Sequence, residues 1–187
     1  MVRHVFERNA ARIRETEGGM ERTAAAAGSS LFFALAPGVV AGVIPWSITG
    51  WSGEPDWFGW RVIGAVVTVC AAAVLIHAFA RFVIEGIGTP APVAPTRHLV
   101  VGGLYRWVRN PMYIAVVSAV LGQAGLFGAP SLLVYAGALM VLFFSFVRLY
   151  EEPTLRAQFG AEYEAYRRAV PGWFPRARPA RVPPATS

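Results

Sequence analysis

The sequence predicts an all-α integral membrane protein with about four transmembrane helices. Hydrophobic residues make up 55% of its 187 residues, charged residues make up only 15%, and the mean hydropathy is +0.46. This composition is too apolar for a soluble domain of this length. A helix needs about 20 apolar residues to cross a bilayer. Four predominantly apolar windows of roughly this length occur, at residues 31–51, 60–83, 111–127 and 131–147.

Proline and glycine shape the first window and the connection between the last two. The first window contains Pro37 and Pro45, so its helix should kink unless neighbouring helices bond the freed carbonyl groups. Only Gly128, Ala129 and Pro130 separate the last two windows. Because glycine ends helices and proline can open them, these windows are predicted to form a C-terminal antiparallel helical hairpin.

The chain divides into three regions. The N-terminal region, residues 1–30, alternates arginine and glutamate over residues 1–22, which fits either an amphipathic helix on the membrane surface or a frayed leader. Residues 31–175 form the membrane domain, and residues 176–187 are predicted to be a disordered basic tail. Within the membrane domain, a helix after the fourth window should pack one apolar face against the membrane or the loops. That face consists of Leu155, Phe159, Tyr163, Tyr166 and Val170.

The distribution of arginine predicts the orientation of the chain. All 17 positive residues are arginines, and they cluster before the first window, between the second and third, and after the fourth. The connection between the first two windows instead carries Glu54 and Asp56. The positive-inside rule therefore places both termini and the loop of residues 84–110 in the cytoplasm. Topology and anionic lipid headgroups account for the net charge of +6, so we expect membrane lipids and no nucleic acid as partners.

Cysteine and histidine are too sparse to predict a metal site. The single cysteine, Cys70, lies among alanine and valine within the second window, and the three histidines at positions 4, 77 and 98 are scattered. Structural metal sites need several such ligands at close, regular spacing. We therefore expect no metal cofactor.

Ionisable residues are predicted to gather at one end of the hairpin. Arg109 precedes the third window, and Glu151 and Glu152 follow the fourth. Two spans of about twenty residues bring the chain back to the same membrane face, so these residues should be neighbours. Such a cluster is either a structural clamp or a ligand site. Other hydrogen-bonding side chains of the same layer, which favour a ligand site, are His98, Tyr105, Asn110, Tyr113, Tyr163 and Tyr166.

Two segments resemble the paired signatures of a known superfamily. They are "RHLVVGGLYRWVRNPMY" (residues 97–113) and "EEPTLRAQFGAEYEAYRRAVPGWFP" (residues 151–175). They resemble the isoprenylcysteine carboxyl methyltransferase and phospholipid methyltransferase superfamily, although Asn110 stands where its RHPxY pattern has histidine. The resemblance implies a bacterial inner-membrane methyltransferase that uses S-adenosylmethionine. It also implies a lipophilic substrate, either an isoprenylcysteine carboxylate or a lipid amine.

The resemblance also implies roles for individual residues. Arg109 and Glu152 would be catalytic. The residues that would hold the cofactor in cytoplasmic segments are His98, Leu99, Val100, Gly103, Tyr105, Asn110, Pro111, Tyr113, Glu151, Glu152, Tyr163 and Tyr166. Two alternatives stay open. One is an NADPH-dependent membrane reductase of the sterol-reductase type, and the other is a non-catalytic membrane scaffold in which the arginine and glutamates are only a clamp.

Overall fold

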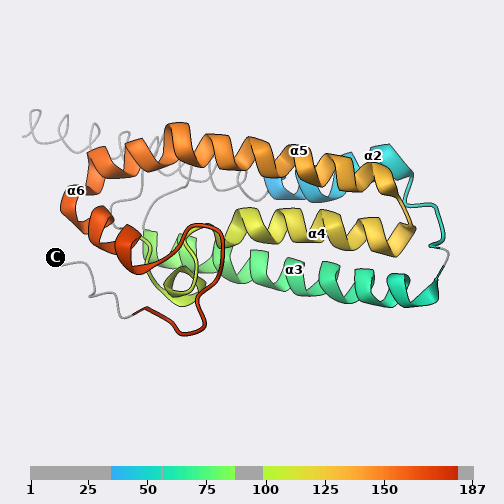
Figure 1. Cartoon of the computed structure of the whole chain (residues 1–187), viewed down its shortest axis with the longest axis horizontal. Helices are drawn as coiled ribbons and strands as arrows, with labels where there is room; N and C mark the ends of the chain where they lie inside the picture. The colour runs from blue at the N-terminus through green and yellow to red at the C-terminus, as the bar shows by residue number, and fades with distance from the viewer. Residues whose placement is uncertain (1–34, 56, 87–98, 181–187) are drawn as a thin grey trace, which may run out of the picture.

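The computed structural model describes residues 35–55, 57–86 and 99–180, and all regular structure in these ranges is helical (Figure 1). The predicted all-α class is therefore confirmed for the described part of the chain. The N-terminal region 1–30 and His98 lie outside it. In chain order the elements are η1 (Val39–Val43), α2 (Ile44–Thr49), α3 (Phe58–Gly86), η2 (Gly103–Arg106), α4 (Pro111–Phe127), α5 (Pro130–Phe146), η3 (Val147–Glu151) and α6 (Glu152–Ala169).

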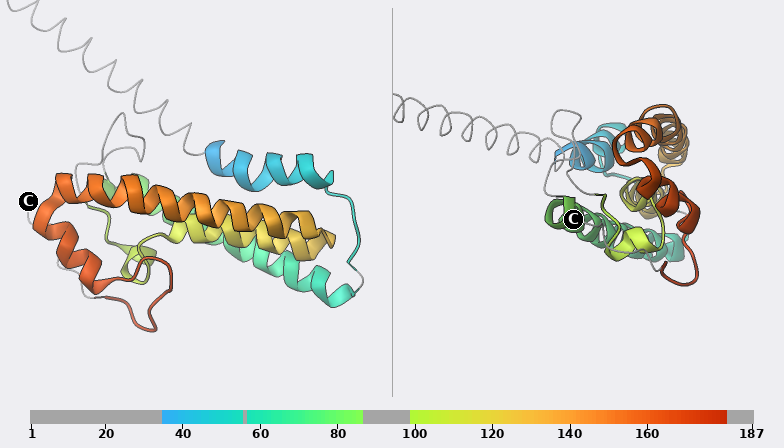
Figure 2. Two further views of the ribbon diagram at one scale, coloured as in Figure 1. Left: turned by 45° about the horizontal axis from the view of Figure 1, so that its top comes forward. Right: turned by 90° about the vertical axis from the view of Figure 1, so that its left-hand side faces the viewer.

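The helices α3, α4 and α5 run alternately up and down, with α4 between the other two (Figures 1 and 2). Glycines allow α3 and α4 to approach closely. A Cβ added to Gly64 would lie 2.5 Å from the carbonyl oxygen of Gly122, and one added to Gly122 would lie 2.4 Å from Oγ1 of Thr68. Small residues at such a crossing allow the close backbone contact that is typical of membrane helices.

The predicted hairpin between α4 and α5 is present. Gly128 ends α4 in the left-handed conformation, with φ of 60°, and Pro130 is the first residue of α5. Glycine adopts this φ without steric penalty, and proline suits the first turn of a helix. The core between these helices consists of Val116, Val117, Val120, Ala124, Leu132, Ala136 and Leu139.

Neighbouring helices satisfy the backbone around Pro45, which is one of the two outcomes that the sequence leaves open. Proline has no N–H, so the carbonyl of Ala41, four residues earlier, loses its usual helical partner. The Nε2 atom of Gln123 donates to that carbonyl at 2.7 Å. The hydroxyl of Tyr135 donates at 3.0 Å to the carbonyl of Val40, within the π-helical turn η1. In an apolar environment these bonds replace those that water would otherwise provide.

Two helices are long and apolar enough to cross a membrane. They are the stretch Phe58–Arg81 of α3 and the continuous helix Pro130–Ala169, whose apolar part is α5. The stretches Leu35–Thr49 and Pro111–Phe127 form shorter apolar helices. Both long helices expose large apolar side chains, such as Val69, Ile76 and Val141, as a surface facing lipid would. The count of four crossings stays a prediction.

The helix after the fourth window is broken in the middle. Gly160 has φ of 49° and ψ of −121°, which interrupts α6 and turns its second half back (Figure 1). This backbone region is open essentially only to glycine. The predicted apolar face nevertheless forms, because Tyr163, Tyr166 and Val170 are buried, with Leu155 and Phe159 packed beside them. Their buried partners are loop residues, namely Leu99 and Ala180.

Candidate functional site

The segment before α4 and the segments after α5 carry the predicted site residues, and these segments meet at one end of the helical bundle (Figures 1 and 2). The segment after α6 is bonded there to the segment before α4. The backbone N–H of Arg109 donates to the carbonyl of Pro171 at 2.9 Å, and that of Asn110 donates to the carbonyl of Gly172 at 3.3 Å. These bonds fix Arg109 and Asn110 between the two segments.

Beyond Gly172, the segment after α6 makes further hydrogen bonds to the segment before α4. The N–H of Arg176 donates to the carbonyl of Trp107 at 3.0 Å, and the N–H of Ala180 donates to the carbonyl of Arg106 at 2.8 Å. The side chain of Arg106 returns a bond from Nε to the carbonyl of Ala180 at 2.9 Å. The prediction of disorder from Arg176 onward is therefore wrong for residues 176–180, while residues 181–187 lie outside the described part.

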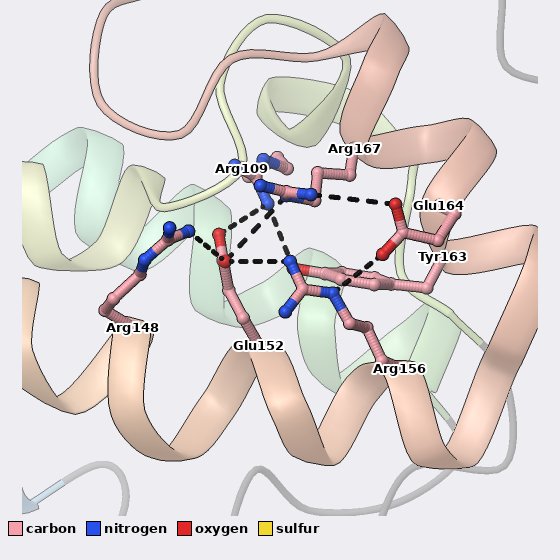
Figure 3. A network of polar contacts seen from close by, with 7 residues as sticks. All are labelled: Arg109, Arg148, Glu152, Arg156, Tyr163, Glu164 and Arg167. Carbon is pink, nitrogen blue, oxygen red and sulfur yellow. Dashed lines mark hydrogen bonds and ion pairs between the residues drawn. The ribbon is translucent and has the colours of Figure 1, made fainter.

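A buried ion pair forms the centre of the site (Figure 3). Nη1 of Arg109 donates to Oε1 of Glu152 at 3.0 Å and to the hydroxyl of Tyr163 at 2.9 Å. The side chains of Arg109 and Glu152 are 13% and 6% exposed. A charge at such depth needs a partner. The predicted meeting of Arg109 and Glu152 is thus confirmed, and it joins residues 43 positions apart.

Three more arginines surround the other oxygen of the same carboxylate (Figure 3). Oε2 of Glu152 lies 3.2 Å from Arg148, 3.4 Å from Arg156 and 3.8 Å from Arg167. Arg156 and Arg167 also pair with Glu164, at 2.7 and 3.6 Å. The hydrogen bond from Arg156 lowers the pKa of Glu164. Both oxygens of Glu152 are therefore already engaged by guanidinium groups.

The second glutamate has a different set of neighbours. The hydroxyl of Tyr113 donates to Oε2 of Glu151 at 3.0 Å. Burial raises the pKa of Glu151, and the bond from Tyr113 opposes that effect. The Tyr113 ring packs on Phe143, with ring centroids 4.8 Å apart, and lies 6.4 Å from the ring of Trp173. The adjacent glutamates thus serve two separate networks.

The remaining candidate residues line the loop side of the site. The hydroxyl of Tyr166 donates to the carbonyl of Tyr105 at 2.8 Å, and burial raises the pKa of Tyr166. Leu99 and Val100 are buried nearby in two apolar clusters. Gly103 has φ of 54°, and a Cβ there would lie 3.1 Å from Cγ of Arg81. These residues contribute to this region chiefly through backbone conformation, hydrogen bonding and packing.

Two buried donors at the centre have no hydrogen-bond partner among the described residues. They are Nε of Arg109 and Nδ2 of Asn110. Such groups are normally paired, because an unsatisfied buried donor costs about 1–3 kcal/mol. A Cβ on Gly172 would lie 3.2 Å from Nη2 of Arg109 and 3.6 Å from Nδ2 of Asn110, so the absence of a side chain at Gly172 lets both groups pack close to its backbone. The two unpaired donors could each bind an acceptor that the described residues do not supply.

A comparison with protein families matches residues 60–162 to the phospholipid methyltransferase family. The match covers α3, α4, α5 and the first half of α6, including Arg109, Glu151 and Glu152. The chain belongs to this family. It is accordingly a membrane methyltransferase of the superfamily that the two sequence signatures resemble. Comparisons with curated proteins and with solved structures gave no significant match.

The structure of this methyltransferase also contains site residues that the sequence reasoning missed. Arg148 and Arg156 lie four residues before and after Glu152, a spacing that places side chains on the same helical face and was available as a signal. Arg167 and Gly172 reach the site only through the break in α6 and the bonds that follow it. Nothing in their local sequence indicates that position.

Proposed function

We propose that this methyltransferase uses S-adenosylmethionine and transfers its methyl group to a lipophilic acceptor, an isoprenylcysteine carboxylate or a lipid amine. The single observation that supports a ligand site, rather than a clamp, is the pair of unpartnered buried donors on Arg109 and Asn110. A clamp needs only the bond from Arg109 to Glu152. An enzyme that binds a polar cofactor also needs donors that the folded chain leaves unused.

The residues present fit the proposed cofactor. S-adenosylmethionine carries a carboxylate, an amino group, ribose hydroxyls and a methyl sulfonium, and it supplies the methyl group when bound. The unpaired donors of Arg109 and Asn110 suit its anionic or acceptor groups. The rings of Tyr113 and Tyr163 suit a cation such as a sulfonium. Glu151 could accept hydrogen bonds from ribose hydroxyls or the amino group.

Glu152 acts in this proposal as a positioning residue. Its two oxygens bind Arg109 on one side and Arg148, Arg156 and Arg167 on the other. Held by Glu152 and Tyr163, the guanidinium of Arg109 loses little conformational freedom when a ligand binds. Alignment of the acceptor with the methyl group and exclusion of water are the main requirements of such a displacement.

We further propose that the site faces the cytoplasm of a bacterial inner membrane and that the chain crosses the membrane four times. The support is the charge of the two ends of the bundle. Arg61 and Glu54, which pair at 3.5 Å, lie at the end away from the site. The arginines at the site end are Arg81, Arg106, Arg109, Arg148, Arg156, Arg167, Arg168, Arg176 and Arg178. By the positive-inside rule, this asymmetry supports a cytoplasmic location for the site end.

The direct test is methyl transfer in reconstituted vesicles. Purified protein is incubated with S-adenosylmethionine carrying a tritiated methyl group, with either N-acetyl-S-farnesylcysteine or phosphatidylethanolamine as acceptor. We expect label in one lipid product with the wild type and none with Arg109→Met. The matched control is Arg168→Met, an exposed arginine on α6, which should retain transfer. Saturable binding of NADPH in place of S-adenosylmethionine would instead support the reductase alternative.

A further inference from the structure

Phe174 lies in the segment after α6, residues 170–180, which follows the last described helix (Figure 1). It is 84% exposed, more than any other large hydrophobic residue in the described part of the chain. One exposed aromatic residue is ordinary on a protein surface, whereas a continuous apolar surface marks a contact with lipid or with another apolar partner. The neighbours of Phe174 decide between these two cases.

The adjacent Trp173 joins this segment to the apolar surface of α5. Its ring centroid lies 5.9 Å from that of Phe144 and 6.4 Å from that of Tyr113, in the first turn of α4. Phe144 is still 53% exposed beside this contact. The exposed apolar surface of α5, which includes Val141, therefore continues through Trp173 to Phe174.

The length of α4 sets the depth of this contact in a bilayer. The helix has 17 residues, or about 25 Å at the usual helical rise, which is shorter than the roughly 30 Å of hydrocarbon in a typical bilayer. If α4 crosses the membrane as proposed above, it lies wholly within the apolar layer. Tyr113 and the ring of Trp173 are then level with the edge of that layer.

The backbone of the segment also suits apolar surroundings. Pro171 and Pro175, on either side of the aromatic pair, have no N–H group to satisfy. The carbonyl groups of Pro171 and Gly172 accept bonds from the N–H groups of Arg109 and Asn110. Irregular backbone at membrane depth needs partners of this kind within the protein.

The charge of the segment is complementary to an anionic lipid surface. Arg168, Arg176 and Arg178 are exposed, and the sequence from residue 165 to residue 180 contains no acidic residue. Aromatic residues at the edge of the apolar layer, with arginines just beyond it, are the usual arrangement at a membrane interface. Arg176 also donates to the carbonyl of Ala169, so Arg178 is the better probe of the attraction to lipid.

We propose that Trp173 and Phe174 insert into the bilayer leaflet at the site end, with Arg178 among its anionic headgroups. The inserted pair holds the segment after α6 against residues 106–110, whose N–H and carbonyl groups bond to it. The bilayer thereby stabilises the part of the backbone that positions the central arginine of the site. This inference rests on the proposed crossing of α4, and it goes beyond methyl transfer because it depends on neither the cofactor nor the acceptor.

Insertion is tested with a fluorophore on the full chain in nanodiscs of phosphatidylcholine and phosphatidylglycerol. Cys70, the only cysteine, is replaced by alanine, and a nitrobenzoxadiazole label is attached after Phe174→Cys. The matched control carries the label after Glu162→Cys, at an exposed charged position on α6. Quenching is measured with iodide in the water and with doxyl-labelled phosphatidylcholine in the bilayer.

We expect the label at position 174 to lose iodide quenching and to be quenched by the doxyl lipid, and the control label to behave in the opposite way. Iodide quenching at both positions would overturn the proposal, since Phe174 would then face water. Protection of position 174 from both quenchers would also overturn it, because protein rather than lipid would then cover Phe174.

Amide hydrogen exchange of residues 106–110 tests whether the inserted pair holds the segment in place. Phe174→Ser removes the apolar side chain, whereas Phe174→Leu keeps one and is the matched control. We expect about ten-fold faster exchange in Phe174→Ser, because losing the burial of one aromatic side chain shifts a local opening equilibrium by about this factor. Exchange in Phe174→Leu should stay close to that of the wild type. Wild-type exchange in Phe174→Ser would overturn the anchoring.

The role of charge is tested by the same measurement on Arg178→Gln. This variant should exchange faster than the wild type only in nanodiscs that contain phosphatidylglycerol, because neutral phosphatidylcholine offers no net charge to attract the arginine. The same effect in both lipid compositions, or none in either, would overturn the contact with anionic headgroups. Neither the quenching nor the exchange experiment uses the cofactor or the acceptor, so their outcomes are distinguishable from a failure of the proposed methyl transfer.

Discussion

Replacing Glu152 with glutamine should destabilise the protein strongly. The substitution keeps the shape of the side chain and removes the charge that compensates the buried Arg109. Breaking a buried ion pair in this way costs about 3–5 kcal/mol. The other three arginines add little, because their side chains are 34–60% exposed and exposed pairs are screened. The expected loss is therefore that of the Arg109 pair alone.

For a chain of this size, that loss lowers Tm by roughly 10 °C. Thermal unfolding followed by circular dichroism in detergent measures the change. The matched control is Glu164→Gln, because Glu164 shares Arg156 and Arg167 with Glu152 but its side chain is 39% exposed. We expect the control to unfold at nearly the wild-type temperature. If the two variants unfold together, burial does not set the strength of the central pair.

Three further substitutions test the packing that supports the site, each by thermal unfolding in detergent. Tyr135→Phe removes a donor to a carbonyl of η1 and should cost about 1 kcal/mol; an unchanged Tm would mean that the bond is dispensable. Gly122→Val inserts atoms where a Cβ already meets α3 at 2.4 Å and should cost about 1–3 kcal/mol, unless the helices separate freely. Gly160→Ala should cost about 1–3 kcal/mol through backbone strain at φ of 49°. Its control is Gly137→Ala, which has open space around it and should not destabilise the protein. Equal stability of these two variants would contradict the strain at Gly160.

The approach of Arg109 to Glu152 could be predicted from the sequence because a helical hairpin has fixed dimensions. Two apolar helices of similar length joined by Gly128–Pro130 must return the chain to its starting level. For Pro45 the sequence restricts the outcome to a kink or to bonds from neighbouring helices, since an apolar environment leaves freed carbonyl groups no other source of donors. Both inferences depend only on backbone geometry and burial.

The second half of the site could not be predicted because it depends on one backbone conformation. Gly160 is a single glycine within a helical pattern, and that pattern does not reveal its positive φ. The reversal at Gly160 brings Arg167 to Glu152 and leads the chain back to Gly172. Order in residues 176–180 was missed for a similar reason, since their composition suggests disorder while their backbone groups bond to Arg106 and Trp107.

The central claim is that the buried cluster binds S-adenosylmethionine, and titration of the cofactor into wild type and Arg109→Met tests it most directly. Glu152 keeps Arg148, Arg156 and Arg167 as partners in this variant, and thermal unfolding in the same detergent establishes that it is folded before binding is compared. We predict saturable binding to the wild type and its loss, or a weakening of at least about ten-fold, in the variant. Equal binding to both proteins, or no binding to a folded wild type, would contradict the account and leave the cluster as a structural clamp.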